Sequence, residues 1–382
     1  MIIQHNHQGM GLYIHIPFCA SKCAYCDFLS FEGMEQDAQA RYVDALICEM
    51  ESAHNKIRDT VIDTVYIGGG TPTALPSPLL CEILRETQRF NISQDAEITV
   101  EMNPGRKHND MRVLLHDLKT HGVNRLSIGL QAWQDNLLTS IKRTHTAQDF
   151  TQTMQAARAA GFDNISVDLM FALPGQTLDH WRESIAQVIS HGARHISAYS
   201  LTPAENTPLW SDLEAGKIHL PDDTTDRAMY HDAIKQLSAA GYNHYELSNF
   251  AKPGYESRHN TSYWLRKPYR GLGLGAHSFD GKTRWHNATN MTQYLNSPTF
   301  REDTETLTQQ DAMAEAMILG LRMTKGVCQH GFKETFGISL RECFGKELEK
   351  LQSRGLLANT GDRIALTPLG LDLANQVFGA FI

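Results

Sequence analysis

The sequence has no long apolar run and no excess of basic residues. It lacks the roughly 20 consecutive apolar residues that a membrane-spanning helix needs. The first ten residues are polar and rich in His and Gln, without the basic start and apolar core of a signal peptide. A formal net charge of −8 gives no basic surface to attract a phosphate backbone. We therefore expect a cytoplasmic protein that binds no nucleic acid and does not insert stably into a membrane.

The sequence also has no low-complexity segment. Its cysteines are odd in number, whereas a disulfide framework would have an even number. With 382 residues, 41% hydrophobic and 20% charged, the chain has a globular composition and is long enough for a large domain and a smaller one. Three of its seven cysteines, Cys19, Cys23 and Cys26, fall within eight residues. This clustering favours a metal site over disulfides.

Short β-rich runs alternate with longer amphipathic ones, which is typical of βα units around a parallel sheet. In the helical stretch before the second run, Tyr42, Leu46 and Met50 recur at helical spacing. Six βα units are too few for a closed eight-stranded barrel. We therefore predict the α/β class, with a partial barrel or open sheet. Its predicted strands are residues 12–16, 64–67, 97–101, 125–130, 165–170 and 195–201.

A conspicuous polar or glycine-rich group lies at the end of each predicted strand. Because the carboxyl ends of parallel strands lie on one face, where βα folds build their active sites, these groups should converge on one site. The glycines would let the backbone approach a ligand and offer unpaired N–H groups, although a tight turn is the simpler alternative. The other groups could also be ordinary polar residues at strand ends. In chain order the groups are the cysteine loop, Gly68–Gly69–Gly70–Thr71–Pro72, Glu101 with Asn103, Gln131, Asp168 and Thr202–Pro203.

The alternation of strands and helices changes after residue 208. An aromatic and glycine-rich segment covers residues 255–279, and from about residue 307 helices dominate, with one β-like run at 363–367. A helix-rich end with a small β-wing is typical of a winged-helix domain. The predicted parts are an N-terminal tail (1–11), a partial barrel (12–208), a barrel extension (209–300) and a winged-helix-like domain (301–382).

The spacing of Cys19, Cys23 and Cys26 places three thiolates on one short loop, which suits three corners of a 4Fe–4S cluster. Three ligands leave one iron open, as chemistry on a bound small molecule requires. From spacing alone, two alternatives remain open. One is a zinc site completed by His15, and the other is three unconnected cysteines.

The segment from Tyr13 to Phe28, YIHIPFCASKCAYCDF, resembles the radical S-adenosylmethionine (SAM) motif in the form found in relatives of coproporphyrinogen III dehydrogenase. This resemblance implies a radical SAM (β/α)6 partial barrel in which the amino and carboxylate groups of SAM chelate the open iron of a 4Fe–4S cluster. Tyr25 would lie near the adenine, and the glycine segment would meet the methionyl amino group. No catalytic residue is assigned. The implied SAM contacts are Tyr13, Tyr25, Gly69, Gly70, Thr71, Glu101, Gln131, Arg143 and Asp168.

Three features differ from the dehydrogenase and are similar to HemW-type heme chaperones. The dehydrogenase has a fourth cysteine where this chain has Phe28. It also has a long N-terminal extension, whereas 18 residues precede Cys19 here. The segment His259–Asn260–Thr261–Ser262–Tyr263–Trp264 matches the HNxxYW motif of HemW proteins. The resemblance extends from Leu12 to Phe381.

The resemblance implies a chaperone that binds heme and transfers it to acceptor hemoproteins, with transient membrane contact where the acceptor is respiratory. His259 would ligate the heme iron, and Tyr263 and Trp264 would cover the porphyrin. Ordinary packing is the alternative for all three residues. Two other functions stay open, an oxygen-independent coproporphyrinogen III oxidase and a radical SAM enzyme with another substrate. The sequence does not set the oligomeric state.

Overall fold

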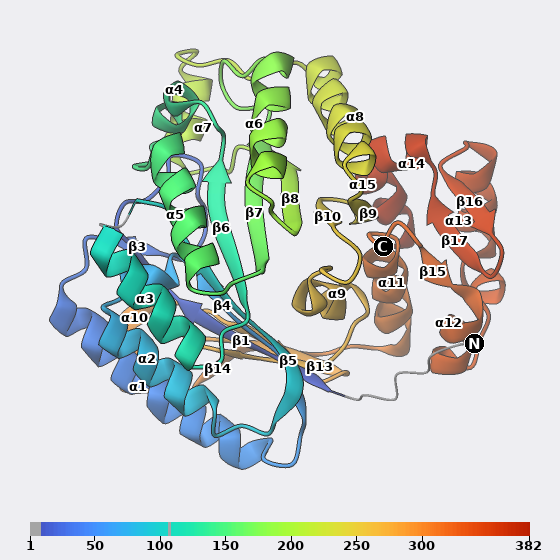
Figure 1. Ribbon diagram of the computed structural model, residues 1–382. Coiled ribbons are helices and arrows are strands. Elements are labelled where there is room, and N and C mark those ends of the chain that lie inside the picture. The colour runs from blue at the N-terminus through green and yellow to red at the C-terminus, as the bar shows by residue number, and fades with distance from the viewer. Residues whose placement is uncertain (1–8, 106–107) are drawn as a thin grey trace.

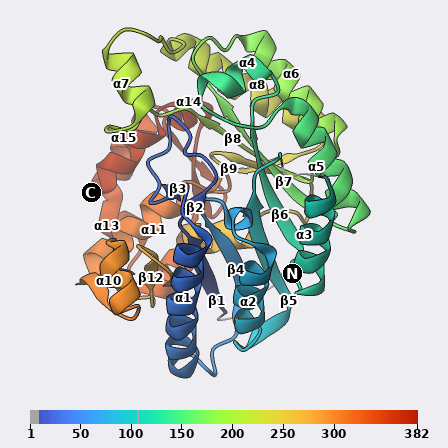
Figure 2. The same ribbon diagram turned by 90° about the vertical axis from the view of Figure 1, so that its left-hand side faces the viewer.

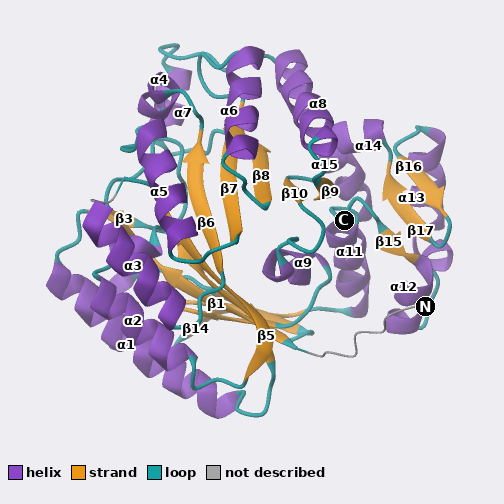
Figure 3. Cartoon of the chain, in the orientation of Figure 1, coloured by secondary structure: helices purple, strands orange, loops and turns teal. Residues whose placement is uncertain are grey.

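The computed structural model describes residues 9–105 and 108–382, so most of the predicted N-terminal tail lies outside the described residues. Within them, twelve strands form one curved sheet, and two smaller sheets accompany it (Figure 3). The strands of the large sheet are β1 (Met10–Ile16), β4 (Ile62–Gly69), β5 (Ile92–Met102), β6 (Arg125–Gln131), β7 (Asn164–Phe171), β8 (His195–Ser200), β9 (Asn243–Glu246), β10 (Asn249–Ala251), β11 (Tyr269–Leu272), β12 (His277–Phe279), β13 (Thr283–Asn287) and β14 (Arg301–Thr306). The small ladder beside β1 consists of β2 (Phe18–Cys19) and β3 (Phe31–Glu32).

The six strands β1, β4, β5, β6, β7 and β8 pair in parallel and in chain order, which confirms the predicted α/β class. Helices follow these strands and stand side by side along the outer face of the sheet (Figure 2). The helices of this part are α1 (Gln36–Lys56), α2 (Ser77–Thr87), α3 (His108–Thr120), α4 (Asp135–Ser140), α5 (Ala147–Ala159), α6 (Leu178–Ser190), α7 (Pro208–Glu214), α8 (Asp223–Ala239), α9 (Arg258–Trp264) and α10 (Met291–Asn296).

Alternation along each parallel strand separates an apolar outer face from a polar inner one. On β4, Val65 and Ile67 are fully buried in the core that the sheet forms with the outer helices. Thr64 and Tyr66 point the other way, toward the inside of the curve, where they contact α9. Successive side chains of a strand point to opposite faces. Each fully buried aliphatic side chain on the outer face contributes about 1.5–3 kcal/mol to stability. The inner face is left free to carry polar groups.

Both edges of the parallel sheet are extended by later parts of the chain. The strand β11 pairs in parallel with β1, with Gly11 opposite Tyr269 and Ile14 opposite Leu272, and β12, β13 and β14 continue from it in antiparallel order. At the opposite edge, β10 pairs antiparallel with β8 and β9. The short helix α9 lies inside the curve of the sheet, on the side away from the outer helices (Figure 1).

A buried carboxylate ties α1 to the β11 edge. Glu49 has no exposed surface, and it accepts hydrogen bonds from the Gly273 N–H at 2.8 Å, Asn287 Nδ2 at 2.8 Å and the Tyr294 hydroxyl at 2.9 Å. Arg270 Nη2 lies 3.3 Å from the same carboxylate. A buried charge is tolerated only when it is paired and hydrogen-bonded, as it is here. This network holds the glycine-rich turn after β11 in place.

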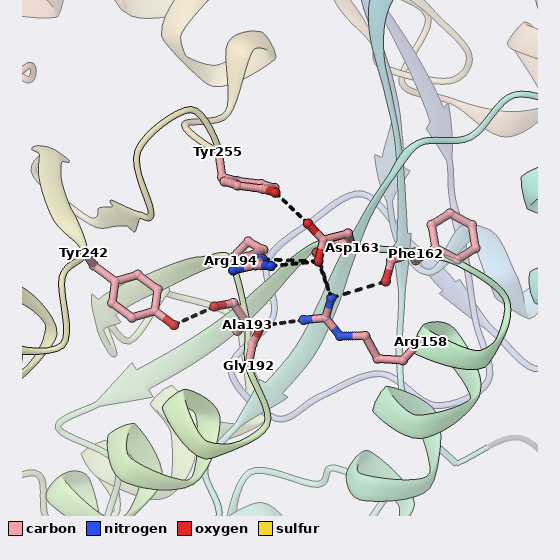
Figure 4. Close-up of polar contacts among 8 residues, drawn as sticks. All are labelled: Arg158, Phe162, Asp163, Gly192, Ala193, Arg194, Tyr242 and Tyr255. Carbon is pink, nitrogen blue, oxygen red and sulfur yellow. Dashed lines mark hydrogen bonds and ion pairs between the residues drawn. The ribbon is translucent and has the colours of Figure 1, made fainter.

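A surface network centred on Asp163 joins three segments near the amino ends of β7 and β8 (Figure 4). Asp163 Oδ1 lies 2.8 Å from Arg158 Nη1, near the end of α5, and 3.0 Å from Arg194 Nη2, just before β8. The Tyr255 hydroxyl donates to Asp163 Oδ2 at 2.5 Å. These hydrogen bonds lower the pKa of Asp163, and the bond from Tyr255 has the largest effect. The network fastens the segment that leads into α9 to the rim of the barrel.

The C-terminal part of the chain has its own hydrophobic core and lies beside the barrel, drawn in orange and red in Figure 1. It packs helices on a three-stranded antiparallel sheet ordered β15-β17-β16. None of the helices in the described part of the chain has both the length and the apolar character needed to cross a membrane. The elements are α11 (Gln309–Gly320), β15 (Val327–Cys328), α12 (Gln329–Phe336), α13 (Leu340–Ser353), β16 (Leu357–Thr360), β17 (Arg363–Leu366), α14 (Pro368–Asp372) and α15 (Ala374–Phe378).

Candidate functional site

The cysteine loop leaves β1 and is closed at its base by the β2–β3 ladder, in which Cys19 stands opposite Glu32. Lys22 Nζ donates to the Phe28 carbonyl oxygen at 3.1 Å and to that of Ser30 at 3.4 Å. The Lys22 N–H donates to the Glu32 carboxylate at 2.7 Å. The path of the loop is therefore fixed by hydrogen bonds from its own residues.

Cys19, Cys23 and Cys26 are free, partly exposed thiols that line one cavity of about 620 Å³. Among residues 9–105 and 108–382, no three His, Cys, Asp or Glu side chains are grouped closely enough to hold a single metal ion. In a 4Fe–4S cluster each thiolate binds a different iron, so three cysteines arranged around one cavity fit the cluster. Burial raises the pKa of the Cys19 and Cys26 thiols, and metal binding would displace their protons.

His15 does not complete a zinc site with these cysteines. Its Nε2 donates to the Leu29 carbonyl oxygen at 2.9 Å, and its Nδ1 accepts from the Tyr13 hydroxyl at 2.9 Å. The ring is buried, and burial lowers its pKa. With both nitrogens engaged, His15 ties β1 to the far end of the cysteine loop. The geometry therefore gives no support to a zinc site of three cysteines and His15.

A partly buried arginine connects two of the cysteines to the strand ends. Arg143 Nη1 lies 3.4 Å from Cys23 Sγ, and Arg143 Nη2 donates to Asn103 Oδ1 at 2.7 Å. The Asn103 amide donates to Thr71 Oγ1 at 3.0 Å, and that hydroxyl lies 3.7 Å from Cys19 Sγ. Groups that donate to ligand sulfurs stabilise the negative charge of a thiolate cluster. This donor set fits a cysteine-bound iron–sulfur cluster.

The glycines after β4 allow close packing against the cysteine loop. A Cβ atom on Gly69, whose φ is +110°, would fall 2.5 Å from the His15 ring, and one on Gly70 would fall 2.7 Å from the Phe18 carbonyl oxygen. The expectation of unpaired N–H groups here is wrong for both glycines. The Gly69 N–H donates to the Glu101 carboxylate at 3.1 Å, and the Gly70 N–H donates to the last carbonyl of β1 at 2.9 Å. The segment therefore serves first to join β4, β5 and the loop.

Two partly buried carboxyl groups stand on the inner wall of the same cavity. Glu101, on β5, accepts from the Tyr66 hydroxyl at 2.6 Å, and Asp168, on β7, accepts from the Ser127 hydroxyl at 3.4 Å. Burial raises the pKa of Asp168 and raises that of Glu101 to about 7. Carboxyl groups in this position can accept hydrogen bonds from the hydroxyl and amino groups of a ligand such as SAM.

The inner wall also contains residues that the sequence reasoning missed. The Tyr199 hydroxyl donates to Gln131 Oε1 at 3.1 Å, and Tyr66 and Ser127 hold the two carboxyl groups. Tyr66 lies two residues from Gly68 and Ser127 lies four residues from Gln131 on the same strands, so the period-two alternation could have identified these two. The strand β8, which carries Tyr199, contains none of the predicted site residues. Tyr13 lies outside this cavity and lines a second one. The predicted residues that the cavity brings together are Cys19, Cys23, Cys26, Tyr25, Gly69, Gly70, Thr71, Glu101, Gln131, Arg143 and Asp168.

The histidine of the HNxxYW segment lies at the start of α9 and faces the inside of the sheet. His259 is 1% exposed and stacks on Tyr66 at a ring-centre distance of 5.1 Å. Its Nδ1 shares a hydrogen bond with the Thr64 hydroxyl, and its Nε2 shares one with the Tyr263 hydroxyl, both at 2.8 Å. Burial lowers its pKa to about 3, so the ring is neutral. Ligation of heme iron by His259 remains a prediction that requires one of these two hydrogen bonds to break.

Comparison with known proteins agrees with this geometry. Residues 13–188 match the radical SAM superfamily, and residues 307–373 match the HemN C-terminal domain. The chain is similar in fold to coproporphyrinogen III oxidase (HemN) of Escherichia coli, with a TM-score of 0.85 at 21% identity over 99% of this chain and 91% of that structure. Members of the radical SAM superfamily carry a 4Fe–4S cluster and SAM.

Sequence relatives cover almost the whole chain. The heme chaperone HemW of Bacillus subtilis is 40% identical over 97% of this chain and 98% of its own length. The heme chaperone HemW of Mycobacterium tuberculosis is 32% identical over 97% of this chain and 94% of its own. Radical S-adenosyl methionine domain-containing protein 1, a mitochondrial protein of Danio rerio, is 32% identical over 90% of this chain. The chain therefore belongs to the HemW family of the radical SAM superfamily.

Proposed function

We propose that the protein binds heme and transfers it to acceptor hemoproteins, and that Cys19, Cys23 and Cys26 hold a 4Fe–4S cluster whose open iron takes SAM as an exchangeable ligand. The observation that carries this proposal is the 40% identity to the heme chaperone HemW of Bacillus subtilis over 97% of the chain. The arrangement of the three thiols around one cavity supports the cluster assignment.

The residues around the cavity have separate roles in this proposal. When bound, the cluster supplies an iron with an open coordination position. Arg143 stabilises the thiolate charge through Cys23. Glu101 and Asp168 offer acceptors to the hydroxyl and amino groups of SAM, and the neighbouring Tyr66 and Ser127 hydroxyls orient them.

Oxidative decarboxylation of coproporphyrinogen III is the second candidate function. The observation that favours it is the fold shared with the Escherichia coli oxidase over 99% of this chain. Phe28 argues against it, because this residue replaces the fourth cysteine of the dehydrogenase motif. Its side chain is 63% exposed at the end of the cysteine loop, where it offers an apolar surface and no thiol.

A paired assay separates the two functions. Anaerobically reconstituted protein is incubated with SAM, a reductant and coproporphyrinogen III, and decarboxylation is followed by mass spectrometry. The same preparation is titrated with hemin while the Soret band is recorded, and the loaded protein is then mixed with an apo-hemoprotein. We expect saturable hemin binding, transfer to the acceptor and no decarboxylated product. Product formed over many turnovers, or no specific hemin binding, would refute the chaperone proposal.

A further inference from the structure

A second cavity, of about 870 Å³, lies between the β1, β11 and β12 side of the inner face and α11. Binding sites for small molecules commonly have about 300–1,000 Å³, with mainly apolar walls and a few polar groups. The cavity shares Phe28, Gly69 and Glu101 with the cysteine cavity, so the two are neighbours. Its aromatic walls are Tyr13, Phe28, Tyr263, Trp264, Tyr269 and Phe279.

One part of this cavity is positively charged. The guanidinium carbons of Arg266 and Arg284 lie 5.3 Å and 5.9 Å from the centre of the Phe279 ring. Both arginines pair with the single carboxylate of Glu315 on α11. Arg266 Nη2 is shielded from solvent and has no hydrogen-bond partner in the part of the chain that the structure describes. Two guanidinium groups and one carboxylate leave one positive charge, which can pair with a ligand carboxylate.

A histidine with free nitrogens lies on another part of the wall. His277, on β12, lines the cavity and is exposed. Its ring centre is 4.9 Å from that of His286, and within residues 9–105 and 108–382 its nitrogens make no hydrogen bond. This distinguishes it from His15 and His259, whose nitrogens are all engaged. Partial burial, together with the positive charges of His286 and Arg284, lowers the pKa of His277, and the neutral imidazole is the form that binds iron.

We propose that this second cavity is the heme site, in which His277 ligates the iron, the aromatic side chains enclose the macrocycle, and Arg266 and Arg284 bind the propionates. This inference rests on the function proposed above and names its binding site. One propionate pairs with the positive charge that Glu315 does not neutralise. The other displaces the Glu315 carboxylate from Arg266 and Arg284. His259 then supports the site from behind by holding the Tyr263 hydroxyl.

Hemin titration of single variants tests the iron ligand. We expect His277→Ala to shift the Soret band and to raise the Kd for hemin about tenfold or more. Added imidazole should restore the band, and binding of iron-free protoporphyrin IX should not change. His286→Ala is the matched control, because His286 is the neighbouring histidine and does not line the cavity. It should bind hemin like the wild type.

Hemin dimethyl ester tests the carboxylate contacts. The wild type should bind hemin more tightly than the ester, and the double variant Arg266→Gln, Arg284→Gln should lose this preference. If the wild type binds no hemin, the proposed function fails, and the site fails with it. If the wild type binds hemin and His277→Ala keeps its spectrum and affinity, the site is wrong while the function stands. Loss of the Soret band in a folded His259→Ala protein, with His277→Ala unaffected, would assign the iron to His259.

Discussion

Replacing His259 by alanine removes an almost fully buried ring that makes two hydrogen bonds and stacks on Tyr66. Truncating a buried aromatic side chain lowers the free energy of unfolding by about 3–5 kcal/mol. Each lost hydrogen bond accounts for about 1 kcal/mol of such a total. Thr64, itself 3% exposed, would lose its imidazole partner and cannot turn to water. We therefore expect His259→Ala to lower the free energy of unfolding by about 4 kcal/mol.

Urea unfolding of the cluster-free protein, followed by circular dichroism and tryptophan fluorescence, measures this loss. The matched control is Tyr263→Phe, which removes one of the two hydrogen bonds and keeps the ring, so it should lose about 1 kcal/mol. A loss below about 1 kcal/mol for His259→Ala would show that the ring does not support the fold. The reasoning that the HNxxYW histidine is structural would then be refuted. A large loss means that hemin titration of this variant must be made below its unfolding transition.

Three further outcomes can be checked. Cys23→Ser should abolish the brown absorption of the anaerobically reconstituted protein and leave the circular dichroism of the cluster-free protein unchanged; stoichiometric zinc in place of iron and sulfide would contradict the cluster assignment. Burial lowers the pKa of His145 to about 4 and that of His259 to about 3, against 6.5 for an unfolded histidine. Because both pKa values are depressed, their stabilisation is complete above pH 6.5 and is lost as the pH falls, by about 3 kcal/mol in total between about pH 7.5 and about pH 5.5. Glu49 and Glu101, whose pKa values burial raises to about 7, act in the opposite direction, so the comparison between variants isolates the histidine effect. Urea titrations at the two pH values should show that lowering the pH costs His145→Gln about 1.4 kcal/mol less free energy of unfolding than it costs the wild type. Glu49→Ala leaves Arg270 buried without its partner and should lower the free energy of unfolding by about 3–5 kcal/mol. The double variant Glu49→Ala, Arg270→Met should recover part of this loss. Equal stability of the single and the double variant would argue against a charge effect.

The residues of the cysteine cavity could be predicted because the rules that locate them are local. Parallel strands all end on the same face, so Glu101, Gln131 and Asp168 were expected to meet once their strands were identified. The helical spacing of Tyr42, Leu46 and Met50 likewise identified the buried face of α1, where all three are fully buried. Spacing and alternation require no knowledge of which strand pairs with which.

The second cavity could not be predicted in this way, because distant segments form it. The strand β11 has four residues and pairs with β1, which lies far from it in the sequence. The residue pattern of β11 alone does not identify β1 as its partner. Tyr13, whose contact with SAM stays a prediction, lines this cavity together with side chains of α9 and α11. Glu49 lies on the apolar face of α1. The sequence pattern did not indicate the distant groups that donate hydrogen bonds to its carboxylate.

The pairing of β1 on both sides has a consequence for how the protein opens. Hydrogen bonds to β4 and β11 hold the strand that leads into the cysteine loop, so it lies in the interior of the sheet. Amides of Leu12 and Ile14 should therefore exchange with solvent only when the sheet itself unfolds, whereas those of the two-residue strands β2 and β3 should exchange earlier. Loss of an oxygen-sensitive cluster would then loosen the loop and leave its anchor intact. Repair of the cluster becomes a local event that does not require refolding.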